Sequence, residues 1–229
     1  MCSSYTTKSK TNKEVYEKNY GKPWLTDDLG VEEKYHDASG EDVIGYPGTP
    51  MPVITIEKPE VIQAYIFGFI PHWLSPEKLN EQRSTFNARI ETITQLATWR
   101  DAWKTGQRCL VCTNGFYEHN KCEKRKMFIH LKDEEYFYYG GIFNNYINKQ
   151  TGEIKKTMAI VTTTSNSLVA EIHSRMPVMI QKGNEGLWMD KTADTQHILM
   201  QFSQPLSPNF MIMDYADDEP KIQVQGSLF

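Results

Sequence analysis

The chain has 229 residues, of which 39% are hydrophobic and 24% are charged, and its mean hydropathy is −0.55. This composition excludes a disordered chain and supports a substantial core, and no apolar run approaches the roughly 18 residues of a membrane span. A net charge of −4 argues against a protein that holds nucleic acid by bulk charge. Residues 214–229 hold four acidic residues and one lysine, so the rest of the chain is close to neutral and leaves room for a local basic groove.

The predicted elements are mostly strands. In chain order we expect a helix over 12–19, strands over 53–56 and 64–70, a helix over 94–104, strands over 108–112, 127–131, 136–139 and 158–163, and helices over 165–172 and 194–202. The polar connection 132–135 predicts that the two strands beside it form a hairpin. Because strands outnumber helices and do not alternate with them, we expect one α+β domain over residues 1–229 with a mixed or antiparallel sheet. Residues 214–229 are expected to form a flexible acidic tail.

The cysteines suggest one metal site, on weak grounds. The start of the chain has no apolar signal-peptide core, so we expect a cytoplasmic protein with reduced cysteines. Cys109, Cys112, His119 and Cys122 superficially resemble a zinc knuckle. However, 108–112 is an expected strand, in which positions three apart face opposite sides, and no turn-forming glycine lies between the first two cysteines. A zinc-dependent binding module is kept as an alternative.

Cys2 is a candidate nucleophile. Removal of Met1, which is favoured before a small residue, leaves a free α-amine next to a thiol. The pKa of an α-amine is about 7.7–8.0, against about 10.4 for lysine, so far more of it is neutral and nucleophilic at pH 7. The amine of such an aminothiol condenses with an aldehyde, and the thiolate then closes a thiazolidine ring. The simpler interpretation is a cysteine in a frayed terminus.

Asn87, Arg89 and Glu91 stand at alternate positions, so in an extended segment all three project to one side. An amide beside a guanidinium suits the binding of a phosphate or sugar oxygen. The alternative is a solvated loop before the helix predicted at 94–104.

Glu118 and His173 are the candidate proton carriers. Glu118 follows a turn and two aromatic residues, where desolvation raises the pKa of a carboxyl toward the range useful for acid–base chemistry. His173 lies between a predicted helix and an apolar run, and a histidine titrates near neutrality. The alternatives are a surface carboxylate and a structural hydrogen-bonding histidine.

Four motifs, taken in order, resemble those of the SRAP family, the SOS-response-associated peptidases. They are Met1-Cys2, Asn87-Ala88-Arg89-x-Glu91-Thr92, Gly115-Phe116-Tyr117-Glu118 and Ile172-His173-Ser174-Arg175-Met176-Pro177. Segments 67–73 and 160–162 are also similar to stretches of the family, and the resemblance spans nearly the whole chain. It implies a single SRAP-type α+β domain with a mixed, largely antiparallel central sheet or a barrel-like β core flanked by helices.

The resemblance also implies an activity on abasic sites in single-stranded DNA. In the family, the mature Cys2 amine attacks the aldehyde of the ring-opened sugar, and the thiol completes a thiazolidine crosslink that shields the site during the DNA damage response. Carried over by position, Asn87 would position Cys2 and the sugar, Glu118 would assist proton transfer and ring opening, and His173 would act as general acid and base. The residues lining the DNA groove would be Arg89 on phosphate, Trp73 by stacking, and Thr162.

The resemblance further implies a monomer with no metal and no organic cofactor, which is nucleoid-associated when bound to DNA. Its Met1 would be removed by its own peptidase activity or by an aminopeptidase. Three positions depart from the family pattern. Ser3-Ser4 replaces Gly-Arg and removes a phosphate contact, His119 replaces a tryptophan, and Phe67 replaces another. A peptidase or amidohydrolase that uses Cys2 as its nucleophile is kept as a second alternative.

Overall fold

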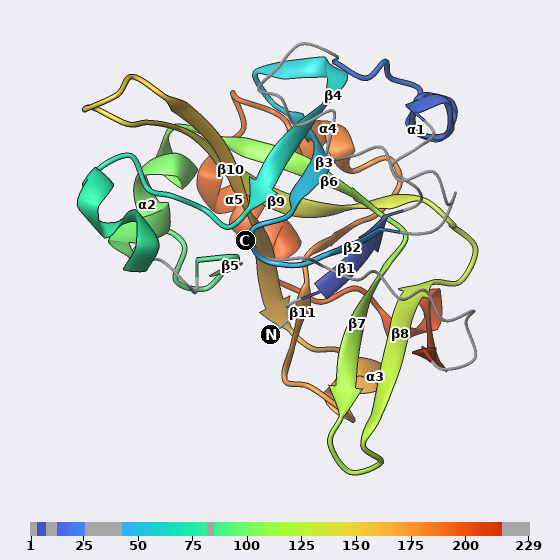
Figure 1. Ribbon diagram of the computed structural model, residues 1–229. Coiled ribbons are helices and arrows are strands. Elements are labelled where there is room, and N and C mark those ends of the chain that lie inside the picture. The colour runs from blue at the N-terminus through green and yellow to red at the C-terminus, as the bar shows by residue number, and fades with distance from the viewer. Residues whose placement is uncertain (1–3, 8–12, 26–42, 82–84, 217–229) are drawn as a thin grey trace.

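The computed structural model describes residues 4–7, 13–25, 43–81 and 85–216. Their strands form two sheets, one of eight strands and one of five (Figure 1). Among these described residues, no helix is long and apolar enough to cross a membrane.

Five strands of the larger sheet close into a barrel. They are β3 (Pro50–Thr55), β4 (Lys58–Phe67), β6 (Arg108–Thr113), β9 (Phe137–Ile147) and β10 (Ile154–Thr164). The ring closes because β10 pairs with β9 on one edge and, in parallel, with β4 on the other. Three short strands extend the barrel: β5 (Asn87–Arg89) and β11 (Arg175–Pro177) on β10, and β12 (Met179–Ile180) on β9.

The five-stranded sheet is antiparallel throughout, in the order β13-β8-β7-β1-β2. Its strands are β1 (Ser4–Thr7), β2 (Val43–Gly45), β7 (Gly115–Asn120), β8 (Arg125–Leu131) and β13 (Met211–Tyr215). Strand β7 follows β6 directly, so the chain passes from the barrel into this sheet at Asn114. The β7–β8 hairpin extends away from the body of the molecule (Figure 1).

The helices are short. They are α1 (Lys13–Tyr20), α2 (Ala97–Lys104), α3 (Ser167–Ala170), α4 (Glu185–Trp188) and α5 (Thr195–Phe202), with 3₁₀ turns η2 (Pro76–Glu81) and η3 (Pro208–Phe210). Helices α1, α2, α4 and α5 pack on the outside of the barrel, whereas Val169 of α3 packs into its interior.

Side-chain alternation divides the apolar residues into two cores. On β6, Cys109 and Val111 point into the barrel, while Leu110 and Cys112 point outward. The barrel core continues onto the inner face of the five-stranded sheet through Phe116. The outer core lies between the barrel wall and the helices. The expected α+β domain with a barrel-like β core is therefore confirmed.

The predicted hairpin of 127–131 with 136–139 is wrong. Strand β8 pairs with β7 and β13 in the five-stranded sheet, whereas β9 pairs with β6, β10 and β12 in the barrel. Both edges of β8 are occupied, so β9 cannot join it. The connection 132–135 joins two sheets rather than two neighbouring strands.

The other predicted elements are present with altered bounds. The helix predicted over 165–172 is confined to α3, where the side chain of Asn166 accepts a hydrogen bond from the backbone N–H of Val169. Asp214 and Tyr215, predicted to open the acidic tail, belong to β13, and residues 217–229 lie outside the described residues.

Candidate functional site

The segments that carry the predicted site meet at one end of the barrel. The register pairs Thr113, the last residue of β6, with Phe137, the first residue of β9. Strand β10 runs antiparallel to β9 from Ile154 toward Thr164, so it leaves the barrel at the same end as β6. Strand β7 follows β6, and α3 and β11 follow β10. The topology therefore brings three distant parts of the sequence together here.

Glu118 lies on the side of β7 that faces the barrel core. It shares this side with Phe116, two residues earlier, and its register partner Met127 is also part of the barrel core. Its side chain is partly buried. The Oε2 atom is fully buried and accepts no hydrogen bond from any residue that the structure describes. The carboxylate of Glu118 can therefore accept a further hydrogen bond through Oε2.

Asn87 and Arg89 project from the same side of β5. Ala88 between them packs in the outer core, so both neighbours face the opposite side, toward the barrel core. Asn87 is buried and Arg89 is exposed. Strand β5 is held beside the end of β10, where Asn87 pairs with Ile160 and Arg89 with Thr162. The alternation expected from the sequence is confirmed for these two residues.

His173 lies in the turn between α3 and β11 and is partly buried. Its Nδ1 atom is 3.0 Å from the backbone nitrogen of Arg175 and 3.1 Å from the backbone oxygen of the same residue. Nδ1 accepts from that N–H in one tautomer of the ring and donates to that carbonyl in the other. The Arg175 backbone thus holds the imidazole ring in place through Nδ1.

Arg175 and Glu91 form a pair to which the sequence analysis gave no role. The guanidinium donates two hydrogen bonds to the carboxylate, at 2.7 and 2.9 Å, and a third to the backbone oxygen of Thr162 at 2.7 Å. Burial acts to raise the pKa of Glu91, but hydrogen bonds and charge from Arg175 outweigh it and lower that pKa. The pair ties β11 to the segment after β5 and so fixes the turn that holds His173.

The predicted DNA-groove residues lie in different environments. Thr162 is 1% exposed, and its hydroxyl lies 3.3 Å from the Arg175 guanidinium, so in this structure it supports Arg175 and offers no surface to a strand. Trp73 is 49% exposed, and its ring nitrogen donates to the backbone oxygen of Ala97, at the start of α2.

Cys2 lies outside the described residues. The strand that follows it is described: Ser4 of β1 pairs with Tyr117 of β7, and Thr6 pairs with Gly115. The beginning of the described chain is therefore hydrogen-bonded to the strand that carries Glu118, one residue from that carboxylate.

The residues of the zinc alternative do not form a site. Cys109 lies in the barrel core and Cys112 in the outer core, on opposite sides of the barrel wall. Burial raises the pKa of both thiols, which disfavours the thiolate that zinc requires. Cys122 and His119 are exposed on the β7–β8 hairpin. Within the described ranges, no three His, Cys, Asp or Glu residues are grouped so as to hold a metal ion.

Comparison with known proteins identifies similar chains. A family model described as SOS response associated peptidase (SRAP) matches residues 1–215. The abasic site processing protein YoqW of Bacillus subtilis (strain 168) is 30% identical over 163 residues, covering 70% of this chain and 67% of the relative. The abasic site processing protein HMCES of Xenopus tropicalis is 26% identical over 152 residues, covering 57% of this chain and 45% of that relative.

Solved structures share the fold. The crystal structure of a protein from Bacteroides thetaiotaomicron matches with a TM-score of 0.78 and 26% identity, covering 93% of this chain and 91% of that one. A crystal structure from Bordetella bronchiseptica matches with a TM-score of 0.75 at 24% identity, covering 94% and 99%. The fold at the end of the barrel is thus one that other solved proteins adopt.

Proposed function

The chain belongs to the SOS response associated peptidase (SRAP) family, and on that premise we propose that it processes abasic sites in DNA by forming a covalent crosslink. Relatives named abasic site processing proteins support the substrate. The aligned part spans less than half of the Xenopus relative, so the proposal concerns the reaction at this site alone.

The proposed nucleophile is Cys2 after hydrolytic removal of Met1. Its α-amine attacks the aldehyde of the ring-opened abasic sugar and forms a Schiff base, with loss of one water. The Cys2 thiolate then adds to the carbon of the C=N bond, and the nitrogen takes up a proton. The product is a thiazolidine, with new C–N and C–S bonds and no change of oxidation state. The reaction requires neither metal nor organic cofactor.

The observation that carries this proposal is the pairing of β1 with β7. Ser4 lies opposite Tyr117, next to Glu118, and Cys2 stands two positions before Ser4, which is at most about 7 Å of extended chain. This length of chain allows the Cys2 amine to reach the end of the barrel where Asn87, Glu118 and His173 are carried.

Glu118 and His173 are proposed to move protons. The buried Oε2 of Glu118 would accept a proton or hydrogen bond during ring opening and condensation. His173, whose ring is held by the Arg175 backbone through Nδ1, would act as general acid and base at the sugar oxygen. Asn87 would orient Cys2 and the sugar from the adjacent strand.

Single-stranded DNA is the proposed partner. Arg89 is exposed beside Asn87 and would contact a phosphate, and the exposed face of Trp73 would stack on a base. Thr162 would not contact the DNA itself and would act only by holding Arg175 in place.

The test is intact-protein mass spectrometry before and after mixing with an abasic single-stranded oligonucleotide. We expect loss of Met1, then an adduct equal to protein plus oligonucleotide minus one water that survives heating in detergent. Cys2→Ala should form no such adduct, although borohydride should trap its amine as a reduced imine. Cys122→Ala is the matched control and should react as wild type does.

A heat-stable adduct in Cys2→Ala would overturn the assignment of the nucleophile. Cys2-dependent turnover of peptide or amide substrates, without any adduct, would instead favour the peptidase or amidohydrolase alternative.

A further inference from the structure

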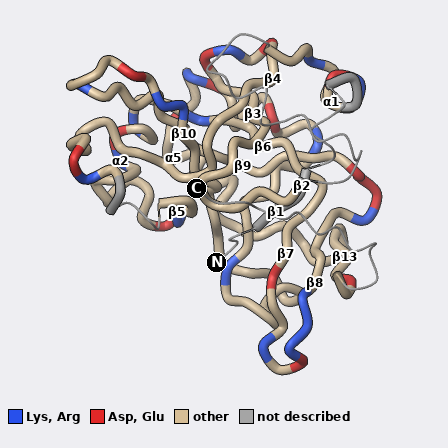
Figure 2. Tube along the Cα trace, viewed as in Figure 1, with Lys and Arg blue, Asp and Glu red and all other residues tan. Residues whose placement is uncertain are grey.

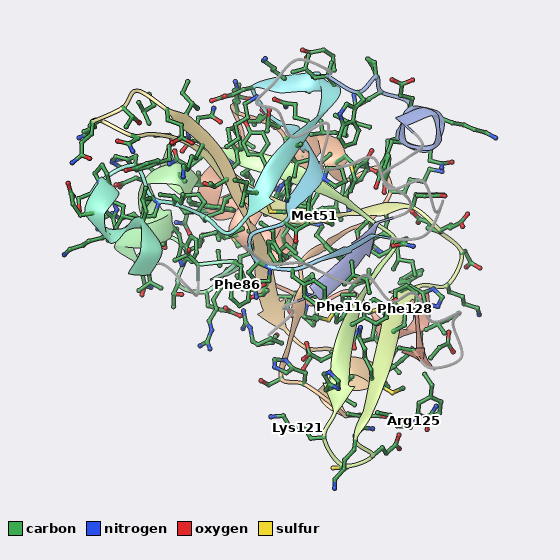
Figure 3. The ribbon with its side chains drawn as sticks, in the orientation of Figure 1. Met51, Phe86, Phe116, Lys121, Arg125 and Phe128 are labelled. Carbon is green, nitrogen blue, oxygen red and sulfur yellow. The ribbon has the colours of Figure 1, made fainter. Side chains whose placement is uncertain are left out.

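We propose that the turn of the β7–β8 hairpin, residues 119–126, is a phosphate-binding arm that holds the DNA strand beside the reacting sugar. This inference rests on the proposed function for the identity of the nucleic acid, and on described residues for the surface itself. Figure 3 shows Lys121 and Arg125 near the far end of the hairpin, with Phe116 and Phe128 nearer its base.

The arm concentrates positive charge in an acidic protein. Four of its last six residues are basic, namely Lys121, Lys124, Arg125 and Lys126, with Glu123 as the acidic residue among them. The whole chain carries a net charge of −4. Figure 2 shows blue stretches, which mark Lys and Arg, around the far end of the β7–β8 hairpin. A local positive surface attracts phosphate even where the net charge of the protein is negative.

Two of the basic side chains are held in place by aromatic rings. The guanidinium of Arg125 lies 3.4 Å from the ring centroid of Tyr215, and the ammonium of Lys126 lies 3.7 Å from that of Tyr117. These contacts reduce the side-chain entropy that would be lost on binding a phosphate. The two rings belong to different strands of the sheet, which carries the arm on a rigid base.

The turn itself is ordered. The Oδ1 atom of Asn120 accepts hydrogen bonds from the backbone N–H groups of Cys122 and Glu123, and Lys124 adopts a left-handed backbone with φ of 55°. The carboxylate of Glu123 accepts a hydrogen bond from the Tyr215 hydroxyl at 3.1 Å. Lys121 and Lys124 are exposed. The one acidic group of the turn is thus engaged with Tyr215, while two lysines face solvent.

The arm begins at the candidate site. Glu118 and Lys121 are three residues apart along the chain, and a strand advances about 3.3 Å per residue, which gives about 10 Å. Even at the spacing of about 3.4 Å per nucleotide along one strand of a duplex, this distance covers only about three nucleotides. A strand whose abasic sugar lies near Glu118 therefore brings neighbouring phosphates within reach of the arm.

The experiment measures binding of undamaged single-stranded DNA, which requires no covalent step. Fluorescence anisotropy across a salt series compares wild type with Lys121→Gln/Lys124→Gln. Each phosphate contact on a single strand contributes about 0.7 to the slope of log affinity against log salt, so loss of two contacts should lower the slope by about 1.4. The matched control is Lys149→Gln/Lys191→Gln, which removes the same charge from two other exposed turns.

The proposal predicts a reduced slope for the arm variant and a wild-type slope for the control. A wild-type slope in the arm variant, or an equal reduction in both variants, would overturn it. Circular dichroism melts should show both pairs folded, since all four lysines are exposed.

The two proposals fail in different ways. The crosslinking assay with wild type and Cys2→Ala tests the nucleophile, whereas the salt series on undamaged DNA tests the arm. If wild type forms no adduct, the proposed function is overturned. The salt dependence of binding to undamaged DNA would still show whether the arm binds phosphate.

Discussion

The barrel core and the outer core are built from opposite faces of the same strands, but they differ in what covers them. The outer core is closed by helices, and within it Trp188 packs edge to face against Trp103 and Phe202. The barrel core has one end where short segments from distant parts of the sequence meet. There the residues change from apolar to polar within one or two positions, as from Phe116 to Glu118.

The outer core contributes mainly to the stability of the fold, whereas the end of the barrel core carries the groups proposed to react. In the outer core, Arg108 is 1% exposed and is anchored to the backbone, because its Nε and Nη2 donate to the oxygens of Trp188 and Asp190, whereas its Nη1 is buried without a hydrogen-bond partner among the described residues. At the end of the barrel core, the buried Oε2 of Glu118 accepts no hydrogen bond from a described residue, and Nδ1 of His173 lies within hydrogen-bond distance of the Arg175 backbone. We expect changes in the outer core to affect folding and changes at the barrel end to affect the reaction.

Substitution of Arg108 should cause the largest loss of unfolding free energy. Its replacement by Ala leaves two buried carbonyl oxygens without donors and opens a cavity beneath Trp103, whose ring lies 5.6 Å from the guanidinium. The free energy of unfolding should fall by about 3–5 kcal/mol, as measured by denaturant titration. Arg108→Met, which keeps most of the volume, should recover part of this loss.

Arg108 begins β6, whereas the candidate site lies beyond Thr113, where that strand ends. The fraction of Arg108→Met that is folded should therefore crosslink DNA at the wild-type rate. A slower reaction per folded molecule would contradict the separation of the two cores.

Alanine substitutions at Gly115 and Gly140 should have intermediate effects on stability and allow the two cores to be compared. A Cβ on Gly115 would overlap the Phe128 ring and lie 2.8 Å from the backbone oxygen of Ile129, and one on Gly140 would lie 2.7 Å from the Trp188 ring. Each Gly→Ala change should cost about 1–3 kcal/mol of unfolding free energy because neither site has room for a methyl group.

Only the change at Gly115 should alter the reaction. It displaces β7, which carries Glu118 three residues further on, and a shift of about 1 Å at a reacting group can slow a reaction by about 100-fold. Single-turnover crosslinking at a temperature where both variants are folded measures this. Equal rates in Gly115→Ala and Gly140→Ala would show that the position of β7 does not control the chemistry.

Substitution of Glu91 should cause the smallest loss of unfolding free energy. Glu91→Gln removes the charge from a bidentate pair that is partly exposed, so the cost in unfolding free energy should be about 1 kcal/mol. Because the pKa of Glu91 is lowered in the folded state, this contribution is complete above the ordinary value of 4.5 and disappears as the pH falls through the lower folded-state pKa.

Denaturant titrations between about pH 3 and 7 would measure the difference between wild type and Glu91→Gln. The two curves should be separated at neutral pH and converge in acid. A constant difference across this range would mean that the Glu91 charge contributes nothing to stability.

The amino-acid sequence alone was sufficient for the α+β class, the approximate positions of β3, β4, β6, β8, β9 and β10, the shared face of Asn87 and Arg89, and the opposite faces of Cys109 and Cys112. Each of these depends on local periodicity, which a short window of sequence contains. The motifs around Asn87, Glu118 and His173 were likewise visible as residue types in order.

Only the tertiary structure decided which strands pair and which motifs meet. The hairpin predicted across 132–135 failed because both edges of β8 were already filled by β7 and β13, a fact that no local pattern contains. The burial of Thr162, the bond between Arg175 and Glu91, and the place of β1 beside β7 also depend on contacts between residues far apart in the chain. Periodicity specifies the face that a side chain takes, whereas the neighbour it meets depends on how all the strands compete for the available edges.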